Sequence, residues 1–76
     1  MLTVPADRHP GTRHFARLFD YAHLPAHLAN VSAPFAVAAQ AAVNLLPDGP
    51  ELTACLRKLV EAKDCAVRAR VLADPA

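Results

Sequence analysis

The sequence of 76 residues predicts an all-α fold: an antiparallel two-helix hairpin with an extended N-terminal arm, assembling into a homo-oligomeric helical bundle. Two apolar runs with helical spacing flank the turn at residues 47–50, and no segment has the alternating pattern of a strand. The chain is also shorter than most domains that are stabilised by a single core. Because 54% of the residues are hydrophobic but only 5% are aromatic, burial against neighbouring copies is expected to supply part of the stability.

Residues 1–18 are expected to form an extended or partly disordered arm with a mildly basic charge. Pro5, Pro10 and Gly11 stand among scattered charges, and the segment has neither helical nor strand periodicity. Residues 15–25 hold most of the aromatic side chains, so this stretch is expected to pack against another part of the protein.

Residues 19–76 are expected to form the hairpin, with a first helix at about 25–46. Pro34 lacks the amide that would bond to the carbonyl of Asn30, so the helix either kinks there or breaks. In the second case a new helix starts with Ser32 as its N-cap.

The second helix is expected at about residues 49–72. Asp48 precedes Glu51 by three residues in the manner of a capping box, and Pro50 suits the first turn of a helix. Apolar residues then recur with helical spacing: Leu52, Cys55, Leu56, Leu59, Val60, Ala62, Ala66, Val67 and Val71. A short turn between two long helices makes them antiparallel neighbours.

The first helix is apolar around most of its circumference. Gln40 and Asn44 are the only polar side chains between Ala33 and Leu46, and they form one narrow stripe because they lie four residues apart. One partner helix covers only one face, so the remaining apolar surface predicts a homo-oligomer.

The second helix is charged, and its charges are expected to face solvent. The pairs Arg57–Glu61 and Asp64–Arg68 have the spacing of surface ion pairs within one helix.

The sequence predicts a cytoplasmic protein without a membrane span. No signal peptide is recognisable, and Cys55 and Cys65 are ten residues apart on one helix, too far to pair; both are expected to be small core residues. The uninterrupted apolar stretch at residues 35–46 would extend only about 18 Å as a helix, against roughly 30 Å of bilayer hydrocarbon.

Catalysis, metal binding and cofactor binding are not expected. No glycine-rich phosphate loop is present, and two helices enclose too little volume to exclude water from a reaction. His23 and His27 have the spacing of helical metal ligands, but no third ligand accompanies them.

An anionic, planar ligand fits the composition better. Cations on the second helix suit phosphate groups, and the aromatic cluster around Tyr21 suits stacking on bases. Oligomerisation would bring these parts together at subunit boundaries.

Four short motifs resemble the helical-hairpin domain of phage anti-defence proteins that sequester signalling nucleotides. They are FDYAH at residues 19–23, LP at 46–47, PELT at 50–53 and LRKLVEA at 56–62, within a resemblance that covers about residues 19–70. The family includes sponges that counter cyclic-oligonucleotide-based antiphage signalling (CBASS) and the related hairpin of some anti-Thoeris proteins. The resemblance implies an oligomer, commonly a hexamer, that binds cyclic di- or trinucleotides without cutting them in the cytoplasm of an infected or lysogenic bacterium.

The resemblance also implies a ligand-binding set in which Tyr21 stacks on a base and cations of a neighbouring subunit pair with phosphate. The residues expected to contact the ligand are Phe19, Tyr21, His23, Arg57, Lys58 and Arg68. Two positions depart from the family pattern: Ala22 stands where a histidine is expected, and Ser32 replaces an arginine.

Two other functions stay open on the sequence. A small structural or protein-binding hairpin, such as a phage adaptor, would use its apolar helix for docking and would tolerate changes in the charges of the second helix. A small nucleic-acid-binding protein would use the basic arm, but the net charge of +1 argues against this function.

Overall fold

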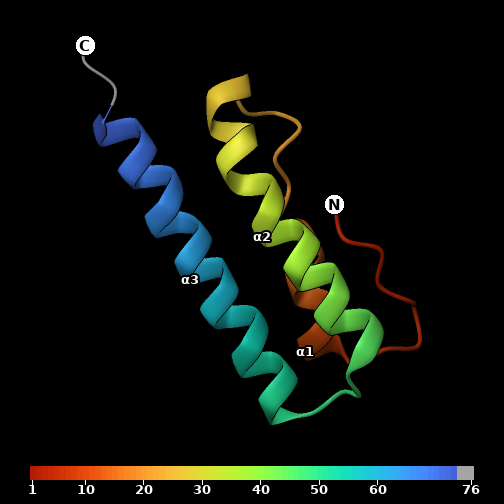
Figure 1. Cartoon of the computed structure of the whole chain (residues 1–76). Helices are drawn as coiled ribbons and strands as arrows, with labels where there is room; N and C mark the ends of the chain where they lie inside the picture. The colour runs from red at the N-terminus through yellow and green to blue at the C-terminus, as the bar shows by residue number, and fades with distance from the viewer. Residues whose placement is uncertain (74–76) are drawn as a thin grey trace.

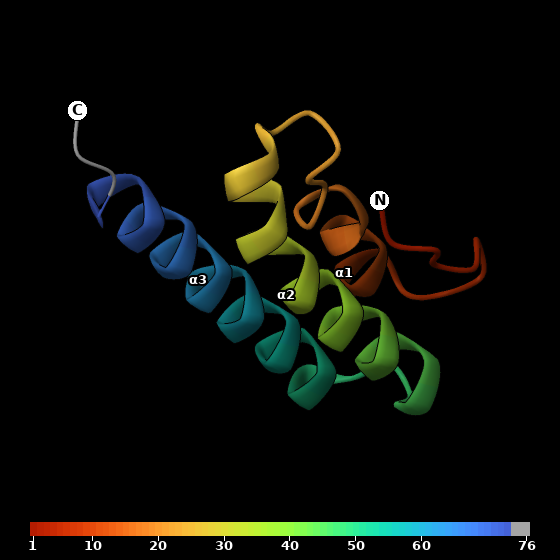
Figure 2. The same ribbon diagram turned by 45° about the horizontal axis from the view of Figure 1, so that its top comes forward.

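The computed structural model describes residues 1–73, and this part of the chain is all-helical, without a β-strand. The helices follow the order α1 (Pro10–Arg13), the 3₁₀ helix η1 (His14–Arg17), α2 (Ala26–Leu45) and α3 (Pro50–Ala73). Helices α2 and α3 lie side by side and run in opposite directions (Figure 1). Helix α1 lies beside this pair, near the turn that joins α2 to α3 (Figure 2).

Helix α2 is continuous through Pro34, so the helix does not break there and Ser32 is not the N-cap of a second helix. Its 20 residues extend about 30 Å, close to the helix expected at residues 25–46 and longer than the apolar stretch at 35–46 alone. Among the described residues, α2 is the one helix that could cross a membrane by length and composition, and 17% of its most apolar stretch is buried. An apolar helix that binds another protein can have the same length and composition, and it too is exposed when the partner is absent.

The capping box expected at the start of α3 is wrong. The Asp48 carboxylate instead accepts hydrogen bonds from the Nε of Arg8 (2.9 Å), the backbone N–H of His9 (3.0 Å) and the hydroxyl of Thr12 (2.7 Å). The first turn of α3 is closed by Thr53, whose backbone N–H and hydroxyl both donate to the carbonyl of Gly49.

The extended arm expected at residues 1–18 is also wrong, because residues 10–17 are helical and the whole segment is docked. Arg8 donates to the carbonyls of Val43 and Leu46, each at 2.8 Å, and so satisfies the C-terminal end of α2. Gln40 exchanges two hydrogen bonds with the backbone of Thr3, at 2.8 and 2.9 Å. These partners are 35 to 38 residues away in sequence, which is why local periodicity does not reveal the docking.

The core lies between residues 1–25, here called the N-terminal segment, and the part of the helical pair nearest the turn. The buried apolar residues are Leu2, Phe15, Phe19, Ala39, Val43, Leu52 and Leu56. Phe15 and Phe19 are each 1% exposed, which confirms that the aromatic stretch packs on the rest of the molecule. The N-terminal segment is therefore an integral layer of the fold.

The outer side of α2 stays uncovered. We call it the exposed α2 face; it consists of Asn30, Pro34, Val37, Ala38, Ala41, Asn44 and Leu45. Val37 is 69% exposed and Leu45 is 80% exposed, although both are large apolar side chains. The face carries no formal charge.

The ion pairs expected within α3 are not formed. Among the described residues, neither Arg57 with Glu61 nor Asp64 with Arg68 makes a salt bridge, and Asp64 pairs with Lys63 at 2.8 Å instead. Arg57 and Arg68 are thereby left without an acidic partner on their own helix.

Candidate functional site

Residues 20–24, here called the 20–24 loop, link two grooves on different helices. Tyr21 lines one groove together with Val37 and Gln40 of α2. His23 lines another groove together with Arg68 of α3. The loop therefore places Tyr21 in one groove and His23 beside Arg68 in another.

The His23–Arg68 groove has a volume of about 330 Å³ and holds mixed charge. Its two acids already have cationic partners, since Asp64 contacts Lys63 and Asp20 contacts the N-terminal amine, each at 2.8 Å. Arg68 is exposed and has no acidic partner within residues 1–73. The groove thus presents one uncompensated cation beside an exposed histidine.

The Tyr21 groove has a volume of about 310 Å³ and is less polar. The amide of Gln40 is occupied, because it bonds to the backbone of Thr3 and donates to Asn44 at 3.0 Å. Val37 belongs both to this groove and to the exposed α2 face. A molecule or a second copy resting on α2 would therefore lie next to the Tyr21 ring.

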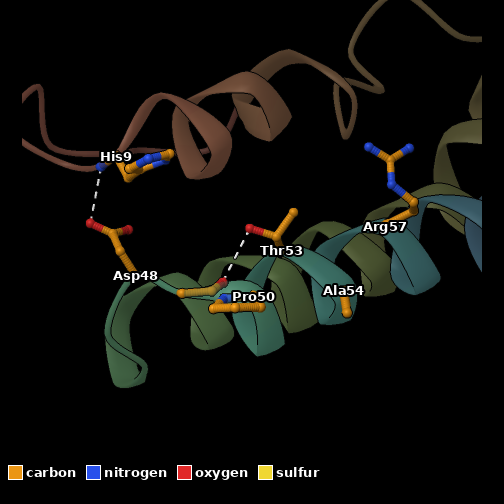
Figure 3. Close-up of a pocket in the computed structure, with 7 residues that line it drawn as sticks. His9, Asp48, Pro50, Thr53, Ala54 and Arg57 are labelled. Atoms are coloured by element: carbon orange, nitrogen blue, oxygen red, sulfur yellow. Dashed lines mark hydrogen bonds between the residues drawn. The ribbon is translucent and has the colours of Figure 1, made fainter.

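A third and larger groove, of about 650 Å³, lies between the start of α1 and the first turns of α3. It is lined by His9, Asp48, Pro50, Thr53, Ala54 and Arg57 (Figure 3). His9 and Arg57 stand at opposite ends of this groove, with Thr53 between them (Figure 3). We call it the His9–Arg57 groove.

The polar groups of the His9–Arg57 groove are held in place by the fold. The Nδ1 of His9 accepts a hydrogen bond from the backbone N–H of Gly11 at 2.9 Å. The guanidinium of Arg57 lies over the Phe15 ring, 5.3 Å from its centroid, in cation–π geometry.

Asp48, at the edge of the groove, carries a negative charge that the neighbouring Arg8 offsets. The Thr12 hydroxyl, the His9 backbone N–H and Arg8 lower its pKa from 3.8 to about 2, against a smaller opposing effect of desolvation. Arg8 pairs with the carboxylate at 2.9 Å. The role of Asp48 is therefore structural: its hydrogen bonds connect residues 8–12 to the turn before α3.

One predicted ligand contact, Phe19, and one predicted core residue, Cys65, need correction. Phe19 is 1% exposed within the core, so it cannot stack on a ligand; an aromatic residue in a sequence does not reveal which role it has. Cys65 is exposed rather than part of the core, while Cys55 is half-buried, and both thiols are free.

The cations of the predicted set do not form one site within a single copy. Arg57 lies in the His9–Arg57 groove and Arg68 beside the 20–24 loop, whereas Lys58 is exposed and lines neither of these grooves. The sequence reasoning missed His9 as a groove residue, because its neighbours in space come from α3. Within residues 1–73, no group of three potential metal ligands is present.

Comparison of the chain with protein-family models, curated proteins and solved structures finds no match, so the family resemblance at residues 19–70 remains a prediction.

Proposed function

We propose that this chain is a non-catalytic, homo-oligomeric phage anti-defence protein that sequesters cyclic di- or trinucleotide immune signals. One observation carries the proposal: the 20–24 loop places Tyr21 beside the exposed α2 face and His23 beside the unpaired Arg68. An aromatic ring and an uncompensated guanidinium are the groups that stack on a base and bind a phosphate.

Assembly through the exposed α2 face supports the same proposal. Because Val37 borders both this face and the Tyr21 groove, a second copy packed on α2 would enclose the Tyr21 groove between subunits. The exposed Lys58 would then be available to a ligand held by a neighbouring copy. The hairpin formed by α2 and α3 is the unit of this assembly, and a hexamer is the state implied by the resemblance.

Isothermal titration calorimetry against a panel of cyclic di- and trinucleotides tests the proposal. We expect saturable binding of at least one member, and mass spectrometry of the ligand released by heat should recover it intact. Arg68→Gln and Tyr21→Ala should each weaken binding about tenfold or more, because each removes a charge-assisted contact or a stacking surface.

Arg17→Gln is the matched control, since Arg17 is exposed on η1 and lines none of the three grooves described above. Absence of heat across the panel overturns the proposed function. Binding that survives both Arg68→Gln and Tyr21→Ala unchanged overturns the proposed site.

A second function is favoured by the exposure of Val37 and Leu45: a structural or protein-binding hairpin without a nucleotide ligand. In that case the apolar α2 face docks on a host protein, as in a small phage adaptor. Charge reversal at Lys58 and Arg68 would leave its activity unchanged, whereas Val37→Lys would abolish it.

A further inference from the structure

We propose that the His9–Arg57 groove is a separate binding site for a small organic phosphate ester. Arg57 binds the phosphate, Pro50 and Ala54 contact the organic part, and the Nε2 proton of His9, at the opposite end of the groove, donates to a polar atom of that organic part. All these groups belong to one copy of the chain. The site therefore requires neither the oligomer nor the Tyr21 groove of the proposed function.

The hydrogen bond from Gly11 fixes which nitrogen of His9 can donate. Because Nδ1 accepts the backbone N–H of Gly11 at 2.9 Å, the ring proton of the neutral imidazole resides on Nε2. A β-carbon at position 11 would approach Nδ1 to 3.1 Å, so glycine permits this close contact. His9 thus offers a pre-oriented N–H donor in the groove.

Arg57 supplies the charge. Among the described residues it has no acidic partner, and its contact with the Phe15 ring leaves the N–H groups of the guanidinium free to donate. A guanidinium binds phosphate through two parallel hydrogen bonds. The Asp48 carboxylate, the acid that lines this groove, is already neutralised by Arg8 and stands near His9 rather than near Arg57 (Figure 3).

The size of the groove argues for a ligand larger than a free anion. Its volume of about 650 Å³ lies within the range of small-molecule sites, roughly 300–1,000 Å³. Inorganic phosphate alone would leave the Pro50 and Ala54 surface uncovered. A phosphate ester with a planar or apolar body would fill the groove, so a nucleoside monophosphate is a suitable probe.

Amide NMR titration of the labelled full-length chain tests the site with adenosine 5′-monophosphate, adenosine and inorganic phosphate. The monophosphate should cause saturable shifts in the Gly11 and Thr53 amides, and adenosine and phosphate should each bind at least about tenfold more weakly. Arg57→Gln should weaken binding of the monophosphate by about tenfold or more. Ala54→Phe should block it without changing any charge.

Arg17→Gln should bind the monophosphate like the wild-type chain. The proposal is overturned if the monophosphate causes no saturable shift, if it binds no better than inorganic phosphate, or if Arg57→Gln and Ala54→Phe both bind it normally. Since the cyclic nucleotides are tested with Tyr21 and Arg68 variants, failure of this site and failure of the proposed function give different results.

Discussion

Asp48 joins the N-terminal segment to the turn between α2 and α3 through a single carboxylate. It accepts hydrogen bonds from three groups of the N-terminal segment: the Nε of Arg8, the His9 backbone and the Thr12 hydroxyl. Arg8 also satisfies two carbonyls at the end of α2. The docking of residues 1–25 and the shape of the His9–Arg57 groove therefore depend on the same few contacts.

This arrangement predicts loss of stability in acid. The pKa of Asp48 is lowered from 3.8 in the unfolded chain to about 2 in the folded protein, so the ionised form favours folding. The contribution is complete above pH 3.8 and disappears as the pH falls from there toward 2. Urea unfolding at a series of pH values should show this decline in the wild-type chain and a smaller decline in Asp48→Asn.

Glu51→Gln is the control for the acid experiment, because Glu51 is an exposed acid three residues further along and makes no hydrogen bond or ion pair with the N-terminal segment. It should follow the wild-type pH dependence. An Asp48→Asn variant with the same acid-dependent loss as the wild type would contradict the assignment.

Two buried hydroxyls with different surroundings give a second prediction. Ser32 and Thr12 are each 1% exposed, but only the Thr12 hydroxyl has a partner, since Ser32 Oγ makes no hydrogen bond within the described residues. Ser32→Ala should therefore raise the free energy of unfolding, by about 1 kcal/mol, because it removes an unsatisfied polar group from a helix interior.

Thr12→Val is the matched opposite case and should lower the urea midpoint, since it leaves the Asp48 carboxylate short of one donor. Both variants are measured in the same urea series. A loss of stability in Ser32→Ala would show that this hydroxyl has a partner after all.

Single residues also mark where sequence reasoning could and could not identify the site. The sequence could indicate that Arg57 and Arg68 are accessible to a ligand, because charges on a solvated helix face stay exposed in the fold. Phe19 does not bind a ligand as the sequence predicts, because aromatic side chains occur in both cores and stacking sites, and only the tertiary structure distinguishes the two. His9 could not be identified, because its position in a groove depends on contacts with α3.

At the level of helices, Pro34 removes one backbone hydrogen bond from the interior of α2. It lies inside a continuous helix, exposes its ring to solvent and leaves the carbonyl of Asn30 without the usual amide partner. Pro34→Ala should therefore stabilise the fold by about 1–3 kcal/mol. Urea unfolding followed by circular dichroism measures the change.

Pro50 is the comparison position for the Pro34 experiment, because it occupies the first turn of α3, where the missing amide has no partner in any case. Pro50→Ala should change stability by no more than about 0.5 kcal/mol. If Pro34→Ala has an equally small effect, the proline is not a defect but part of the packing geometry of α2.

The long helices were predictable, and the short ones were not. Periodic apolar residues and the turn at 47–50 indicate helices at about 25–46 and 49–72, and the structure has α2 at Ala26–Leu45 and α3 at Pro50–Ala73. Helices α1 and η1 have four residues each, too few to show a period. Helix α1 is held by the bond of Thr12 to the distant Asp48, and the chain before it by the bonds of Arg8 and Thr3 to α2 and the turn that follows it.

At the level of the whole molecule, the fold is elongated, with extents of 45 × 20 × 17 Å, and has little interior. The N-terminal segment covers part of the α2–α3 pair, but the exposed α2 face stays open over much of the length of α2. Because the face has no formal charge, a complementary surface should also be apolar and uncharged. The same face on a second copy, related by a two-fold axis, meets both conditions.

Self-association is therefore the prediction for the intact protein. Sedimentation equilibrium should show a concentration-dependent oligomer, and the double variant Val37→Lys with Leu45→Lys should be monomeric, because it places charge on the interface. Leu72→Lys is the matched control: Leu72 is 77% exposed on α3, away from this face, and its substitution should leave the oligomer intact. A wild-type chain that stays monomeric at all concentrations contradicts the prediction, as does one that sediments with lipid vesicles while the double variant does not, since α2 would then contact a bilayer rather than a second copy.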